Sequence, residues 1–84
     1  IMAKIDLKFL DYLYDDTFIS VRSEVTEYYD LKKDETINTN VLRINLNSES
    51  LKDEGFIDLD ISTAIKFAKT LRTEINKAKE AQNG

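Results

Sequence analysis

Residues 56–81 read FIDLDISTAIKFAKTLRTEINKAKEA, a stretch that joins a strand pattern to a helix pattern. Isoleucine and leucine alternate with aspartate over 56–60, which is typical of a half-buried strand. From there on, apolar residues recur every three to four positions, which predicts an amphipathic helix over 62–81. Ser62 is the expected N-cap, with Asp60 just upstream, where the helix dipole favours an anion. The apolar stripe of this helix is expected to comprise Ala64, Phe67, Ala68, Leu71, Ile75 and Ala78.

Three further strands are predicted upstream, over 4–14, 17–28 and 36–47. Each carries the two-residue alternation and the β-branched and aromatic content that strands favour. In the first of them the phase slips by one residue at Phe9-Leu10, which indicates a β-bulge or a sharp bend. Polar or charged segments separate the predicted strands.

The predicted architecture is α+β, with four antiparallel strands in a meander and one C-terminal helix packed on one face of the sheet (ββββα, two layers). Short connections favour this arrangement, because neighbours in sequence are then neighbours in space. With 84 residues, the chain is expected to form a single domain over 1–84. Leu71 lies at the centre of the stripe, so Leu71→Ala is expected to destabilise the fold strongly.

Composition excludes several chemistries. The chain has no cysteine, histidine, proline or tryptophan and only two glycines. Disulfides, Cys/His zinc sites, imidazole-dependent catalysis and glycine-rich phosphate loops are therefore ruled out. Asp58 and Asp60, with Asp6 on a neighbouring strand, could form a carboxylate cluster. A solvated strand and the helix dipole explain them better, so no enzyme activity, metal or cofactor is expected.

Charge is unevenly distributed along the chain. Residues 1–61 hold seven basic and fourteen acidic residues, a balance of −7, whereas residues 62–84 hold five and two, a balance of +3. The acidic body disfavours tight binding to a phosphate backbone, which depends on dense positive charge. Lys66 and Lys69 are candidates for a local anion contact, although a solvated helix face accounts for them more simply.

No stretch reaches the roughly 18–20 apolar residues of a membrane span, so membrane insertion is not expected. The first residues, Met2-Ala3-Lys4-Ile5-Asp6, are charged at once and do not resemble a secretory signal peptide. A cytoplasmic location is therefore expected.

The sheet face opposite the helix is the candidate binding surface. Alternation sends aromatic and arginine side chains to it, and these residue types are enriched in protein interfaces. Large surface aromatics can also simply cover their cross-strand neighbours. Because so small a domain is short of core, we expect this face to form a homodimer. Its candidate residues are Phe18, Arg22, Tyr28, Val41, Arg43 and Phe56.

Two functions follow from this surface. The first is a small non-catalytic protein-binding or regulatory module that acts as a homodimer through its sheet face, with a partner protein left unidentified. The second is a weak single-stranded nucleic-acid-binding protein. In architecture alone, the pattern of residues 56–60 followed by 63–71 resembles the PC4, Whirly and PUR-alpha group of dimeric single-stranded nucleic-acid binders. That resemblance implies base stacking on a sheet face, and no site residue is carried over from it.

Overall fold

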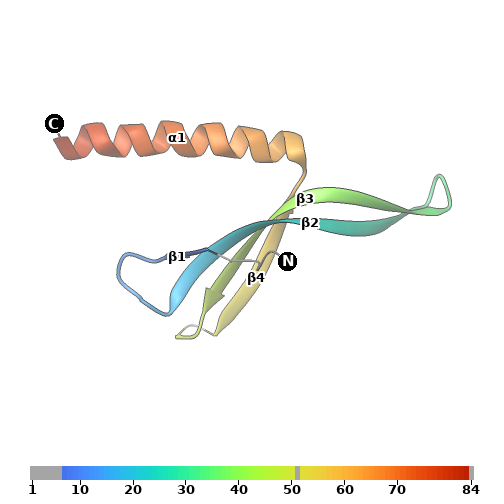
Figure 1. The fold of residues 1–84 in the computed structure, drawn as a ribbon, viewed down its shortest axis with the longest axis horizontal. Coiled ribbons are helices and arrows are strands. Elements are labelled where there is room, and N and C mark those ends of the chain that lie inside the picture. The colour runs from blue at the N-terminus through green and yellow to red at the C-terminus, as the bar shows by residue number, and fades with distance from the viewer. Residues whose placement is uncertain (1–6, 51, 84) are drawn as a thin grey trace, which may run out of the picture.

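The computed structural model describes residues 7–50 and 52–83. Four strands are followed by one helix, and their order along the chain matches the predicted ββββα arrangement (Figure 1). The elements are β1 (Lys8–Leu10), β2 (Thr17–Asp30), β3 (Glu35–Ser48), β4 (Asp53–Leu59) and α1 (Ile61–Asn83). The predicted α+β class is therefore confirmed.

The sheet is a simple meander in the order β1-β2-β3-β4, with every neighbouring pair antiparallel. In the β2–β3 pair, which is the longest, Thr17 lies opposite Ser48 and Asp30 opposite Glu35. β4 begins three residues earlier than predicted, because Asp53 continues the ladder opposite Ser48. The register places directly paired residues on the same side of the sheet.

β1 is much shorter than the predicted strand over 4–14, and residues 4–6 lie outside the described part of the chain. The carboxylate of Asp11 accepts hydrogen bonds from the backbone N–H groups of Leu13 and Tyr14, at 2.9 and 3.1 Å. This side-chain turn satisfies backbone donors that a strand would otherwise pair with its neighbour. The predicted phase slip at Phe9-Leu10 therefore coincides with the end of the strand.

The β2–β3 hairpin extends well past its neighbours. β1 pairs only with residues 18–20 of β2, and β4 only with residues 42–48 of β3. The hairpin beyond them is a two-stranded arm, which points away from α1 (Figure 1). Its turn is closed by the Asp30 carboxylate, which accepts from the N–H of Lys32 at 2.9 Å. Asp34 completes the turn with a φ of 52°, a left-handed conformation that aspartate tolerates.

Asp60, and not the predicted Ser62, caps the helix. Its carboxylate accepts from the backbone N–H of Thr63 at 3.1 Å and from the hydroxyl of Ser62 at 3.2 Å. Its carbonyl accepts the first helical bond, from Ala64 N–H at 2.8 Å. These bonds lower the pKa of Asp60, with the Thr63 bond as the largest cause. The helix thus begins one residue after β4 ends, and Ser62 lies inside its first turn.

Packing of the helix on the sheet is far less extensive than the predicted two layers require. Among the described strands α1 contacts mainly β3, and Figure 1 shows it leaving the sheet after its first turns. Phe67, Leu71 and Ile75 remain 41, 50 and 48% exposed. The chain has a radius of gyration of 16.8 Å, whereas a compact domain of this length has about 12 Å. The single-residue connection at Asp60 explains this extended shape, because it sets the direction in which the helix leaves the sheet.

Candidate interaction surface

The register brings the predicted interface residues to one side of the sheet. Arg22 lies opposite Arg43, and Arg43 lies opposite Asp58, so all three strands contribute. We call this side the polar sheet face. It contains Lys8, Phe18, Ser20, Arg22, Glu24, Tyr28, Val41, Arg43, Asn45, Phe56 and Asp58.

Arg43 is at the centre of the polar sheet face. Its Nε lies 2.7 Å from Oδ1 of Asp58, and its Nη2 lies 3.0 Å from Oδ2, which is the two-point contact that a guanidinium makes with a carboxylate. The same guanidinium lies over the ring of Phe56, at 4.2 Å from the ring centre. The hydrogen bonds from Arg43 lower the pKa of Asp58, and Asp58 in turn raises the pKa of Arg43.

Two further contacts occupy the polar sheet face. Arg22 Nε lies 2.7 Å from Glu24 Oε1, and the ammonium of Lys8 lies 4.7 Å from the centre of the Phe18 ring. Each arginine of the directly opposed pair Arg22–Arg43 therefore has its own carboxylate, which offsets the repulsion of like charges across strands. The polar sheet face largely satisfies itself within one chain.

Two of the six predicted residues depart from the expectation. Val41 was expected to be exposed but is only 5% exposed, so it belongs to the core and cannot contact a partner. Tyr28 is exposed but lies on the two-stranded arm, six residues along β2 from Arg22. At about 3.3 Å per residue this separation is about 20 Å. Arg22 lies opposite Arg43, and Arg43 contacts Phe56, whereas Phe18 lies four residues along β2 from Arg22.

The opposite side of the sheet is the larger uncovered apolar surface. We call it the apolar sheet face, and its members are Phe9, Ile19, Val21, Val25, Leu42, Ile44, Leu46, Ile57 and Leu59. The sequence predicted these residues to lie beneath the helix. Most of them are exposed, with Ile57 at 62%. Among the described residues Val41 is the one hydrophobic side chain that is buried, at 5% exposure.

The apolar side chains of the helix are also uncovered. We call Ala64, Phe67, Ala68, Leu71, Ile75 and Ala78 the helix stripe. The predicted period is correct, since these residues share one side of α1, but no residue of α1 that the structure describes is buried. The sequence does contain a signal that the helix stays apart from the sheet. Only one residue lies between the end of β4 at Leu59 and the start of α1 at Ile61. The helix stripe and the apolar sheet face are thus two apolar surfaces that remain largely exposed to solvent.

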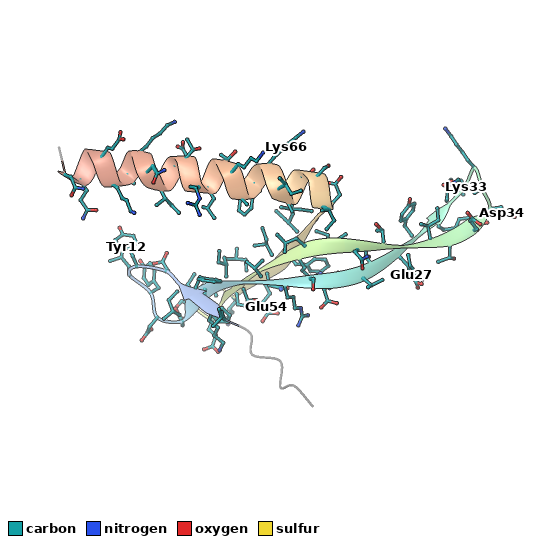
Figure 2. The ribbon with its side chains drawn as sticks, turned by 45° about the horizontal axis from the view of Figure 1, so that its top comes forward. Tyr12, Glu27, Lys33, Asp34, Glu54 and Lys66 are labelled. Carbon is teal, nitrogen blue, oxygen red and sulfur yellow. The ribbon has the colours of Figure 1, made fainter. Side chains whose placement is uncertain are left out.

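The carboxylates considered as a cluster have separate roles. Asp58 binds Arg43 and Asp60 caps the helix, whereas Asp6 lies outside the described residues. Within residues 7–50 and 52–83, no group of three acidic side chains could hold a metal ion. The candidate anion contacts Lys66 and Lys69 are exposed on α1, and Figure 2 shows Lys66 on the side turned away from the sheet.

Asp16 joins two loops at one end of the sheet, a contact that the sequence did not predict. Its carboxylate accepts hydrogen bonds from the backbone N–H of Ser50, at 2.8 Å, and from the Ser50 hydroxyl. The bond from this hydroxyl is the main cause that lowers the pKa of Asp16. Nearby, the hydroxyls of Thr17 and the buried Ser48 are 2.8 Å apart. This polar junction fixes the β1–β2 and β3–β4 connections to each other.

Comparison with protein-family models, with curated proteins and with solved structures found no significant match for the chain. No helix within the described residues is both long enough and apolar enough to cross a membrane.

Proposed function

We propose that this protein is a small, non-catalytic protein-binding module that acts as a homodimer through its apolar sheet face. The observation that carries the proposal is the accessible surface area of the chain, 7654 Å². A compact monomer of 9.7 kDa exposes only about 5,100 Å² by the usual scaling with mass. The chain exposes about half as much again as a self-sufficient domain of its size.

The uncovered area includes large apolar side chains of both the sheet and the helix, such as Ile57 at 62% and Leu71 at 50% exposure. Both the apolar sheet face and the helix stripe consist of residues whose burial stabilises a fold by about 25 cal/mol for each Å² removed from water. A typical stable interface removes about 800 Å² from each partner. The uncovered surface is large enough to supply such an interface. A second copy of the chain is the one partner that is always present with it.

This proposal places the contact on the apolar sheet face and not on the polar sheet face considered first. The arginines of the polar sheet face already bind Asp58 and Glu24 within the chain. Binding through them would require those contacts to be remade, which returns little net free energy. Binding through the apolar sheet face would not require any ion pair of this kind to be broken.

The nucleic-acid alternative gains no specific support. Base stacking needs open aromatic faces, and one face of the Phe18 ring and one of the Phe56 ring are occupied by Lys8 and Arg43. The strand region also carries the acidic excess of the chain. A titration of single-stranded oligonucleotides at several salt concentrations tests this alternative, because phosphate contacts make affinity fall steeply with salt.

A matched pair of variants on β4 tests the proposed dimer. Phe56 and Ile57 are adjacent, are 58 and 62% exposed, and lie on opposite sheet faces. Sedimentation equilibrium at tens of micromolar protein should show a dimer for the wild type and for Phe56→Ser. Ile57→Ser should sediment as a monomer or dissociate at much higher concentration. A folded monomeric wild type, or a dimer lost in Phe56→Ser and kept in Ile57→Ser, would overturn the proposal.

A further inference from the structure

The apolar sheet face contains a hollow at Gly55. This residue lies opposite Leu46 in the β3–β4 ladder, so its missing side chain belongs to the apolar sheet face. A Cβ placed on Gly55 would have no atom within 4 Å. The hollow has a volume of about 400 Å³ and is lined on this face by Ile44, Leu46 and Ile57. The chain's own side chains leave it open.

The helix stripe carries a ridge of large apolar side chains. Phe67, Leu71 and Ile75 are spaced four residues apart, which places them about 6 Å from one another along one ridge. All three are about half exposed. Packing on a sheet would bury this ridge, yet the helix leaves the sheet after its first turns (Figure 2).

The junction at Asp60 keeps the helix from closing onto its own sheet. One residue separates β4 from α1, and that residue is held by the bonds from Ser62, Thr63 and Ala64. Turning the helix onto the apolar sheet face would require this cap to open. A short, well-bonded connection of this kind favours exchange of an element between two copies, because the second copy supplies the same surface without strain.

We propose that α1 of one copy lies on the apolar sheet face of the other, with a side chain of the helix ridge seated in the hollow at Gly55. Exchange is reciprocal across a two-fold axis. This inference rests on the proposed homodimer and specifies its geometry. It covers both apolar surfaces at once, whereas pairing two sheets face to face would leave both helix stripes in water.

Charge favours the exchanged arrangement. The segment 62–84 carries +3 and the segment 1–61 carries −7, so a helix against a sheet joins opposite charges. Two helices against each other would join like charges. Arg72 and Lys79 border the helix stripe beside Leu71 and Ile75. Basic residues beside the helix stripe of one copy therefore approach the acidic strand segment of the other.

Filling the hollow tests this geometry. Gly55→Val places its Cβ in open space in the single chain, and valine has the higher strand propensity, so the sheet should form normally. In the exchanged dimer the valine side chain fills the hollow that the partner's helix ridge would otherwise occupy. We expect circular dichroism like that of the wild type and a dimer dissociation constant raised at least tenfold, with Gly55→Ala intermediate. An unchanged dissociation constant for Gly55→Val would contradict the inference.

Cross-linking tests the placement directly, because the wild-type chain contains no cysteine. One preparation carries Gly55→Cys and a second carries Leu71→Cys. Mixing the two under mild oxidation should give a heterodimeric disulfide as the main product. If Gly55→Cys alone instead links to itself efficiently, the sheets face each other, and the exchange is wrong while the homodimer stands. A wild type that is monomeric in sedimentation removes the proposed function and this inference together.

Discussion

Arg43 binds both carboxylate oxygens of Asp58 from the neighbouring strand, at 2.7 and 3.0 Å. The pair ties the centre of β3 to the edge strand β4, and the guanidinium also covers the ring of Phe56. A lysine has one compact charge and cannot reproduce both contacts. This geometry makes the pair the main polar link between the two strands.

Arg43→Lys should lower the thermal midpoint modestly, because it removes the two-point contact and uncovers Phe56. Asp58→Asn should cost less in the Arg43→Lys background than in the wild type, since the two residues act as a unit. Thermal unfolding of the four proteins in a double-mutant cycle measures this coupling. Strictly additive effects would show that the contact contributes nothing to stability.

The free energy of unfolding should fall with pH only in the acid range. Asp16, Asp58 and Asp60 have a lowered pKa in the folded chain. Between that value and the ordinary aspartate pKa of about 3.9, the unfolded chain binds more protons than the folded one. Stability from these groups is therefore complete above about pH 5 and is lost as the pH falls further. Urea unfolding at a series of pH values measures the slope.

Asp58→Asn is the control for the acid response. The asparagine does not titrate, so this variant should lose less stability between pH 5 and pH 3 than the wild type does. A wild type whose stability rises on acidification over that range would contradict the assignment.

Leu71→Ala should destabilise the protein in a way that depends on its concentration. Alanine and leucine have similar helix propensities, and Leu71 is half exposed within one chain, so the isolated chain has little to lose. A fully buried Leu→Ala change costs about 2–5 kcal/mol. A loss in that range that shrinks on dilution, as the wild type dissociates, would mean that a second copy covers the residue. Thermal scans at several concentrations, with Lys69→Ala as the exposed control, distinguish the two cases.

Asp60→Ala should reduce helix content and stability more than Ser62→Ala. Asp60 accepts the bond from Thr63 N–H, whereas Ser62 only donates to Asp60. Asp60→Asn keeps an acceptor at the cap and should retain most of the stability at neutral pH. Circular dichroism at the helix band and thermal unfolding measure the series. If Ser62→Ala proves the more harmful change, the cap assignment is wrong.

Local patterns predicted the elements well, since alternation and helical period depend only on neighbouring residues. They placed the helix stripe correctly, but they wrongly predicted that the sheet of the same chain buries it. The period of Phe67, Leu71 and Ile75 shows which residues need cover, but it does not show whether the same chain provides it. The Arg43–Asp58 contact needed the β3–β4 register, which no single-strand pattern contains. Likewise Asp60 and Ser62 are both good capping residues, and only the exact end of β4 decides between them.

The meander has a consequence for synthesis on the ribosome. Each strand pairs with the one made just before it, and the ladder is complete once Leu59 has emerged. No later segment is needed to set the register of the sheet, because α1 only follows it. The hairpins can therefore assemble in the order of translation, before α1 has emerged. The apolar sheet face then forms before α1 is available, so its side chains face water during that stage of synthesis.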